Sequence, residues 1–419
     1  MNSADRRPVA VVVDGYSAGN FYPAAFARIG ADLVHVQSTP ELITSMAPPN
    51  FADYLANVVG SDERDLVERL RAYSPVCVVA GQDGAVPMAD RLGELLGVPS
   101  NGSALSRARR DKYEMIETLR RAGVRCARQF KSTDPAAVAA WAQEHDGYPV
   151  VVKPLSSAGS DGVRICRDVE EVVAAAEAVL ASQNIFGASN TEILVQSYLR
   201  GTEYIVDTVS CDGQRYTCGV WEYEKTLLSS GRNIYNRDLL VDPDGELVPA
   251  LTSYIDEVLA ALDVRWGPAH AEVIVTEDGP VLVEIGTRLN GNLHADFHDL
   301  CLGHNQAGLT AEAYVRPERF TERYGDGTYR KLRPAAVYNA PTAFEGVVAS
   351  VDQSVVDEIA GLESVFSLAV KLRPGARITP TVDLLTSPLR AHLTAEREEQ
   401  LTADYERLAK LKDHVYRLA

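Results

Sequence analysis

Apolar runs of strand length alternate with amphipathic segments of helical period over residues 8–100. The runs are PVAVVVDG, DLVHVQ and PVCVVAG, and the helical pattern recurs at about 22–29, 62–72 and 86–97. Strands that alternate with helices predict a doubly wound parallel sheet, which binds ligands beyond the carboxyl ends of its strands. Two loops lie at such ends, GYSAGN at 15–20 and GQDG at 81–84. GYSAGN lacks the three-glycine spacing of a dinucleotide-binding loop, so we do not expect an NAD site.

A β-hairpin is predicted at residues 270–292, HAEVIVTEDGPVLVEIGTRLNGN. Two apolar-rich runs flank the turn residues EDG. Carboxylates interrupt these runs at Glu272 and Glu284, where antiparallel strands can bring them side by side, and Arg288 follows. Glutamates are rarely buried in strands unless they are paired or bind a metal, and two converging carboxylates suit Mg²⁺. The alternative is an amphipathic hairpin with two solvated glutamates.

A lysine at the end of an apolar strand marks residues 148–163, YPVVVKPLSSAGSDGV. Lys153 needs an anionic partner in such a strand. The Gly/Ser loop that follows lets backbone N–H groups approach phosphate oxygens closely. It is not a P-loop, because the lysine precedes the loop and no helix starts at the end of the loop. The alternative is a flexible hairpin loop.

Two further segments flank this region. Upstream, a basic cluster precedes the predicted helix DKYEMIETLRRAG, which Asp111 caps and Gly123 ends; the cluster is Arg107, Arg109, Arg110 and Lys112. Such a cluster is usually a solvated helix face. Downstream, residues 191–208 read as two strands joined by a short linker. Backbone exposed at 196–199 would hydrogen-bond a flat heterocycle, and Glu203 is placed to hold a ribose diol.

Composition narrows the class of protein. A chain of 419 residues is too long for one compact core and is expected to hold about two to four subdomains. With 41 basic and 58 acidic side chains, the net charge of −17 argues against nucleic acid or an anionic membrane as a partner. The apolar runs are too short for a transmembrane helix or a signal-peptide core. Six scattered cysteines predict reduced thiols and a cytoplasmic location.

The last third of the chain carries histidines and then short strands. His294 and His298 are spaced i, i+4 as a metal pair on a helix would be, and His304 follows. No HExxH motif accompanies them, so a structural or substrate-lining role is the better interpretation. From about residue 330 short strands and turns are predicted, and a charged amphipathic helix is expected after Thr394.

These motifs, in this order, resemble the ATP-grasp superfamily and are most similar to bacterial L-amino acid ligases, which join two free amino acids into a dipeptide. The resemblance extends over nearly the whole chain. Its motifs are GQDGAVPMADRLGELLGVPSNG, the lysine of RDKYEMIETLRRAGV, VVKPLSSAGSDGV, LVQSYLRGTEYIVD, GPAHAEVIVTEDGPVLVEIGTRLNG and the C-terminal GVVASV…LRPGARITPTVDLLTSP.

The resemblance implies a role for each matching residue. It assigns ATP binding to three groups: phosphate-binding Lys112 and Lys153, the phosphate-covering lid of Ser156, Ser157, Gly159, Ser160 and Gly162, and an adenine hinge of Gln196, Ser197, Tyr198 and Leu199. It assigns the ribose to Glu203 and Mg²⁺, for which Mn²⁺ substitutes, to Glu272 and Glu284. Arg288 would hold the transferred phosphate or the acyl-phosphate oxygens.

The chain departs from the common pattern at one metal position. An asparagine often stands two residues after the second glutamate, where this chain has Gly286. L-amino acid ligases also tend to have glycine there, which leaves the third metal ligand open, with Asn290 as a candidate.

The implied fold is α/β (α+β), an ATP-grasp fold in four parts. These are an N-terminal Rossmann-like domain (1–105), a small subdomain with a mobile lid (106–200), a core with the metal site (201–330) and a C-terminal antiparallel subdomain (331–419).

The implied reaction joins the carboxylate of one L-amino acid to the amine of a second amino acid through an acyl phosphate, with ADP and phosphate as products. The alternative is an ATP-grasp ligase for a different acid or amine in a natural-product or purine pathway. Its partners would be ATP and amino acids, and a homodimer is the assembly suggested.

Overall fold

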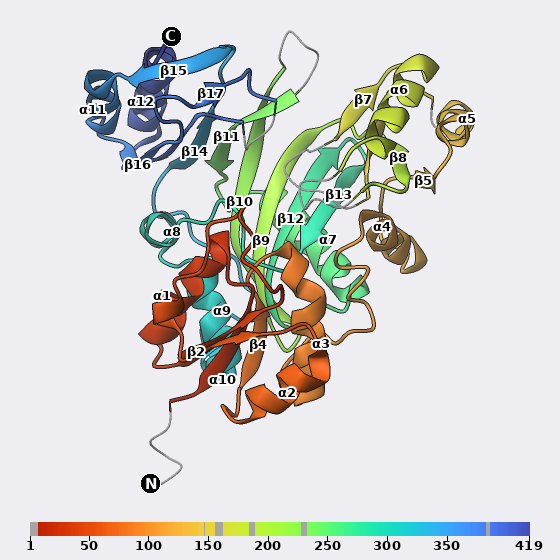
Figure 1. Ribbon diagram of the computed structural model, residues 1–419, viewed down its shortest axis with the longest axis vertical. Coiled ribbons are helices and arrows are strands. Elements are labelled where there is room, and N and C mark those ends of the chain that lie inside the picture. The colour runs from red at the N-terminus through yellow and green to blue at the C-terminus, as the bar shows by residue number, and fades with distance from the viewer. Residues whose placement is uncertain (1–6, 146, 156–161, 184–188, 228–232, 383–385) are drawn as a thin grey trace.

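The computed structural model describes residues 7–145, 147–155, 162–183, 189–227, 233–382 and 386–419. Four parts are visible in Figure 1: an N-terminal domain in red and orange, a yellow small subdomain, a central green and teal sheet, and a blue C-terminal part.

The N-terminal domain is the predicted doubly wound sheet. Its parallel strands lie in the order β3-β2-β1-β4: β1 Val9–Val13, β2 Asp32–Gln37, β3 Asn57–Val59 and β4 Cys77–Ala80. Its helices are α1 Tyr22–Arg28, α2 Glu63–Arg71 and α3 Val86–Leu96. Alternate residues of β1 enter two separate hydrophobic clusters, one on each face of the sheet. Burial on both faces explains the continuous apolar runs of these strands.

The small subdomain packs two helices on an antiparallel sheet. The strand order is β5-β8-β6-β7: β5 Gln129–Ser132, β6 Val150–Pro154, β7 Arg164–Cys166 and β8 Ile193–Ser197. Helices α5 Pro135–His145 and α6 Val169–Leu180 bury their valine and alanine faces against it. Helix α4 Lys112–Arg121 precedes this sheet, and the Asp111 carboxylate caps it by accepting from two backbone N–H groups, as predicted.

An eight-stranded sheet forms the centre, with the order β13-β12-β9-β10-β11-β14-β18-β16. The strands are β9 Thr202–Cys211, β10 Gln214–Leu227, β11 Asn233–Leu240, β12 Gly267–Thr276, β13 Gly279–Gly286, β14 Ala335–Ala340, β16 Val365–Val370 and β18 Leu389–Thr394. The expected boundary near residue 330 does not interrupt this sheet, because β14 pairs with β11. The helices that follow core strands are α7 Leu247–Ala261, α8 Ala295–Leu302, α9 Gln306–Val315 and α10 Pro317–Arg323.

The remaining C-terminal elements are small. Strands β15 Gly346–Val351, β17 Arg377–Ile378 and β19 Tyr416–Leu418 form a three-stranded sheet. Helices α11 Gln353–Ala360 and α12 Glu398–Leu411 accompany it, α12 being the predicted amphipathic helix.

A buried arginine joins the N-terminal domain to the central core. Arg109 is 1% exposed and donates to the Asp90 carboxylate of α3 at 2.9 Å. Its remaining N–H groups donate to backbone carbonyls on both sides of the junction: Asn101, Gly102, Leu262 and Asp263. Of the basic cluster, this residue is therefore structural, whereas Arg107 is exposed and Lys112 reaches the candidate site.

Candidate active site

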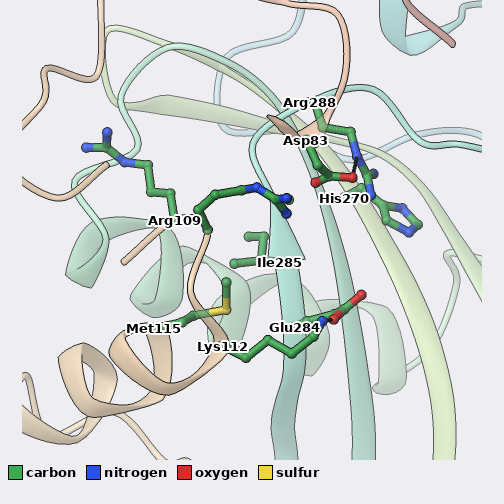
Figure 2. A pocket seen from close by; sticks show the side chains of 10 residues that line it. Asp83, Arg109, Lys112, Met115, His270, Glu284, Ile285 and Arg288 are labelled. Atoms are coloured by element: carbon green, nitrogen blue, oxygen red, sulfur yellow. Dashed lines mark hydrogen bonds and ion pairs between the residues drawn. The ribbon is translucent and has the colours of Figure 1, made fainter. Parts of the chain in front are cut away.

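The two predicted glutamates meet on the β12–β13 hairpin. Glu272 pairs directly with Glu284 across the two strands, and His270 pairs with Gly286 two residues further along the ladder. Paired residues of antiparallel strands point to the same face, so the two carboxylates lie next to each other. In Figure 2 Glu284 lies beside Lys112, the first residue of helix α4.

Two lysines from neighbouring elements accompany these carboxylates. Lys112, at the first turn of α4, extends to Glu284 and forms an ion pair with it (Figure 2). Burial lowers the pKa of Lys112 to about 8, although Glu272 acts in the opposite direction. Lys153 is 5% exposed at the end of β6. Burial and the charge of Lys112 lower the pKa of Lys153 to about 7. A buried lysine with so low a pKa lacks a full counter-charge, which polyphosphate oxygens would supply.

A buried network of charged and polar side chains lies beside Glu272. His270 Nε2 lies 3.8 Å from the Glu272 carboxylate, and His270 Nδ1 lies 2.8 Å from Asp207. Burial opposes the charged imidazole, but Asp207 outweighs it and raises the pKa of His270 to about 9. Burial likewise acts to raise the pKa of Glu272, but His270 and Lys112 hold it below its usual value. The glutamate therefore remains a carboxylate at neutral pH.

Asn290 belongs to the same network. Its Nδ2 donates to Asp207 at 2.8 Å, and its Oδ1 accepts from the Asn292 N–H at 2.8 Å. Asn292 in turn donates to Asp238, at 3.4 Å. The amide oxygen that was a candidate third metal ligand is thus engaged within the protein. Asn290 Nδ2 also orients the Asp207 carboxylate that contacts His270, and its role as a third metal ligand stays a prediction.

Arg288 is held by a side chain from the N-terminal domain. Its Nε donates to Asp83 at 2.9 Å, and a further N–H donates to the Leu289 carbonyl. Burial acts to raise the pKa of Asp83, but the positive charges of Arg288, Arg110 and Lys112 outweigh burial and hold this pKa below its usual value. A cavity lies beside this pair, and Figure 2 shows side chains from α4, β12, β13 and both flanking loops converging on it.

Gly286 leaves room for the Asp83–Arg288 pair. A Cβ atom at position 286 would lie 2.9 Å from Asp83 Oδ1 and 3.2 Å from Arg288 Cζ. The asparagine that is common at this position elsewhere would therefore collide with an aspartate that enters from another domain. This contact gives a physical reason for the departure noted in the sequence.

The proposed adenine and ribose residues lie between the small subdomain and the core. Gln196 and Ser197 end β8, and Tyr198 and Leu199 continue into the linker to β9. The Gln196 side chain donates to Gln129, at 2.9 Å. Glu203 is 6% exposed near the start of β9 and forms an ion pair with Lys225 of β10. The predicted strand–linker–strand order is present, and its linker lies at the junction of the two sheets.

Most of the predicted lid lies outside the described residues: Ser156, Ser157, Gly159 and Ser160. Gly162, at its end, has φ of +70° and packs against Pro154. A side chain at Gly162 would be strained and would meet the proline ring at 2.8 Å.

The histidines of the α8 region do not form a metal pair. His294 precedes α8, and His298 Nδ1 bonds to the His294 carbonyl at 2.9 Å. His304 Nε2 bonds to the Cys218 carbonyl, and burial lowers its pKa to about 4. Within the described part of the chain, no group of three or more His, Cys, Asp or Glu side chains is arranged to hold a metal ion. Glu272 and Glu284 thus offer two hard oxygen donors, which fits a divalent cation that completes its shell with water and phosphate oxygens.

Sequence reasoning missed Asp83, His270 and Asp207. Asp83 lies in the loop at residues 81–84, which the sequence marks as a possible ligand-binding loop because it follows a parallel strand. Nothing in the sequence indicates that Asp83 contacts Arg288. His270 and Asp207 stand in different strands, and only the register of β9 with β12 reveals that they face each other.

Comparison with known proteins agrees with this geometry. Residues 146–296 match the family model described as an ATP-grasp domain. Over 395 residues the chain is 33% identical to Dapdiamide A synthase from Enterobacter agglomerans, which covers 93% of this chain and 92% of that protein.

Solved structures share the architecture. The L-amino acid ligase from Bacillus licheniformis superposes with a TM-score of 0.75 at 18% identity, and 99% of each chain is covered. Carboxyaminoimidazole ribonucleotide synthase from Aspergillus clavatus, solved with ATP, gives 0.70 at 15% identity and covers 98% of this chain and 99% of that one. Both show the fold.

Among the described residues, no helix is both long and apolar enough to span a bilayer. The fold, the converging carboxylates and lysines, and the full-length relative lead to one conclusion. The chain belongs to the ATP-grasp superfamily and is a carboxylate–amine ligase that forms a carbon–nitrogen bond.

Proposed function

We propose that this ligase activates the carboxylate of an L-amino acid as an acyl phosphate and joins it to the amine of a second amino acid. The observation that carries the proposal is the meeting of Glu284, Lys112 and Arg288 around one cavity. Glu272 stands directly opposite Glu284 on the paired strand. Nucleotide binding alone does not require so many charged groups from three parts of the chain. The architecture shared with an L-amino acid ligase supports amino acids as the substrates.

In the proposed reaction the carboxylate attacks the γ-phosphate of ATP in line and displaces ADP. Lys112 and Lys153 would hold the phosphates: both lysines are buried at the site, and burial is the main cause that lowers the pKa of each. Arg288, fixed by Asp83, would bind the transferred phosphoryl group or the acyl-phosphate oxygens. The acceptor nitrogen, after losing a proton from its ammonium form, then attacks the acyl carbon; the C–N bond forms, the C–O bond to phosphate breaks, and the second proton leaves with the phosphate or passes to solvent. Preorganised charges of this kind each contribute about 10²–10³ in rate.

Glu272 and Glu284 would hold Mg²⁺, which neutralises charge on the β- and γ-phosphates when it is bound. His270 and Asp207 keep Glu272 ionised and oriented for this role. Without nucleotide, Lys112 neutralises Glu284.

The nucleoside would lie between the small subdomain and the core. The 196–199 linker would contact the adenine, and Glu203 the ribose. The lid, whose serines lie outside the described residues, would cover the phosphates and keep water from the acyl phosphate.

A second candidate substrate class follows from the sequence relative. Since the chain is 33% identical to Dapdiamide A synthase, the acid or the amine that it joins is alternatively a natural-product intermediate rather than a free amino acid. The chemistry at Glu272, Glu284 and Arg288 would be the same.

A panel of the twenty amino acids taken in pairs, with ADP release and amide formation as readouts, tests this proposal. We expect ADP release to require a carboxylate substrate and amide formation to require both partners. Glu284→Gln serves as the inactive control. If no amino acid stimulates ADP release above that of the control, the amino-acid assignment is wrong.

A further inference from the structure

A second polar region lies on the same sheet face as the metal-site glutamates. Strand pairing runs from Glu272 through Ile205 and Trp221 to Leu240, and Asp238 stands two residues before Leu240 on β11. Asp238 therefore points to the same face as Glu272. The pairing continues from Asp238 to Val337 of β14, and Asn339, two residues on, pairs with Arg390 of β18.

Several buried polar atoms in this region have no hydrogen-bond partner among the described residues. They are Asp238 Oδ1, Asn339 Nδ2, His392 Nε2 and His294 Nδ1. An unpaired buried polar group costs about 1–3 kcal/mol, and the cost is larger for a charged group. Four such atoms gather on neighbouring elements here, and a bound polar ligand would satisfy them.

Asp238 is a buried carboxylate with one free oxygen. It is 2% exposed, and Asn292 donates to its Oδ2 at 3.4 Å. Burial raises the pKa of Asp238 to about 7, although the charge of Arg390 acts in the opposite direction. Despite this influence the two side chains form no direct ion pair in the part of the chain that the structure describes. The carboxylate thus faces a cation that it does not touch.

Arg390 is held in a fixed orientation. Its Nε donates to Asn339 Oδ1 at 2.8 Å, and Asn339 is fully buried. This bond fixes the plane of the guanidinium and leaves its terminal N–H groups without a partner among the described residues. A guanidinium presented in this way matches a carboxylate.

We propose that Asp238 and Arg390 bind the two charged ends of the acceptor amino acid, with its ammonium at Asp238 and its carboxylate at Arg390. The inference rests on the proposed amino-acid ligase function. It assigns the acceptor subsite to the region between β11 and β18, which the proposed roles of the metal-site residues leave unused.

The order of the strands decides the direction in which the acceptor lies. Asp238 stands on β11, three strands from the Glu272 strand, and Arg390 stands two strands further on. A zwitterion bound to both residues therefore directs its nitrogen toward the metal-site glutamates and its carboxylate away from them. An amine in that position faces the acyl phosphate. The reverse orientation would place one carboxylate against another.

The first test separates acceptor binding from carboxylate activation. Hydroxylamine is a small uncharged nucleophile without a carboxylate, so it traps an acyl phosphate without using the proposed subsite. We expect Asp238→Asn and Arg390→Gln to form hydroxamate at rates within about threefold of the wild type. Their KM for the acceptor amino acid should rise by about 10- to 100-fold, the loss expected for one charge-assisted hydrogen bond. Asp244→Asn, an exposed aspartate in the turn after β11, is the matched control.

The second test asks which end of the acceptor each residue binds. The wild type should prefer an acceptor amino acid over its carboxamide, and Arg390→Gln should lose that preference. Asp238→Asn should keep it. The proposal is overturned if the acceptor KM is unchanged in both variants, or if hydroxamate formation falls together with amide formation. Should Asp238→Asn fail to fold, the acid-to-amide preference of Arg390→Gln alone decides. A wild type that forms no hydroxamate would instead refute the acyl-phosphate function.

Discussion

Gly286→Ala should disable the enzyme by displacing Arg288 while leaving the fold intact. The added Cβ would lie 2.9 Å from Asp83 Oδ1, 3.2 Å from Arg288 Cζ and 3.4 Å from Arg288 Nε. Ordinary contacts of a Cβ atom with such neighbours begin at about 3.4 Å, so both side chains must withdraw by several tenths of an ångström. The 2.9 Å bond from Arg288 to Asp83 cannot then persist in its present geometry.

The magnitude follows from the role proposed for Arg288. A displacement approaching 1 Å at a group that positions the reacting atoms costs about 10²-fold in rate. Overpacking of one methyl group costs about 1–3 kcal/mol of folding free energy. Gly286→Ala is therefore expected to lower kcat by about 10- to 100-fold and to shift the thermal unfolding midpoint by only a few degrees.

The assay is steady-state ADP release with the most active substrate pair, together with calorimetric unfolding. Gly291→Ala is the matched control, because nothing lies within 4 Å of a Cβ atom at that exposed glycine of the same loop. Asp83→Ala in the Gly286→Ala background should add less than the sum of the two single losses, since both act on Arg288. Near-normal kcat in Gly286→Ala, or equal losses in both glycine variants, would refute the reasoning.

Three further predictions follow from the charged groups. Glu284→Gln should fold normally and lose at least about 10²-fold in ADP release, with residual activity near wild type counting against the metal assignment. The pKa of Lys153 is about 7 without nucleotide and should rise when phosphates bind, so titration calorimetry at pH 8 should show proton uptake when an ATP analogue binds. The affinity for the analogue should fall from pH 7 to pH 9, and Lys153→Met should abolish the proton uptake. Binding heats of the wild type that do not depend on the buffer would argue against contact between Lys153 and the phosphates. Arg109→Met should lower the free energy of unfolding in denaturant by about 3–5 kcal/mol, because Asp90 is left buried and unpaired. Arg107 is exposed, so Arg107→Gln should cost less than about 0.5 kcal/mol. Equal effects of the two substitutions would contradict the structural role of Arg109.

Local patterns were enough to predict the elements that build the site. Alternation and turn chemistry placed the hairpin, and the structure confirms that Glu272 and Glu284 face each other. The Asp111 cap and the parallel sheet of residues 8–100 are also confirmed, although the short strand β3 was not predicted. These features depend on interactions between residues close in sequence, so sequence alone contains the necessary information.

Long-range partners could not be predicted in the same way. Asp83 and Arg288 are joined only because the N-terminal domain docks beside the hairpin. Arg109 resembles a surface charge in sequence, yet five acceptors from two domains surround it. Asp238 and Arg390 lie on one sheet because β14 and β18 extend the core sheet, whereas the sequence suggested a separate C-terminal subdomain. Each case depends on contacts between parts of the chain that lie more than a hundred residues apart.

The central claim, that the carboxylate attacks the γ-phosphate of ATP, can be tested by following one oxygen atom. A carboxylate substrate labelled with ¹⁸O is incubated with ATP, Mg²⁺ and the acceptor, and the phosphorus products are analysed by mass spectrometry. The account predicts one ¹⁸O atom in each inorganic phosphate released, together with one ADP per amide formed. Label in AMP, with pyrophosphate as the second product, would show adenylation and would contradict the mechanism.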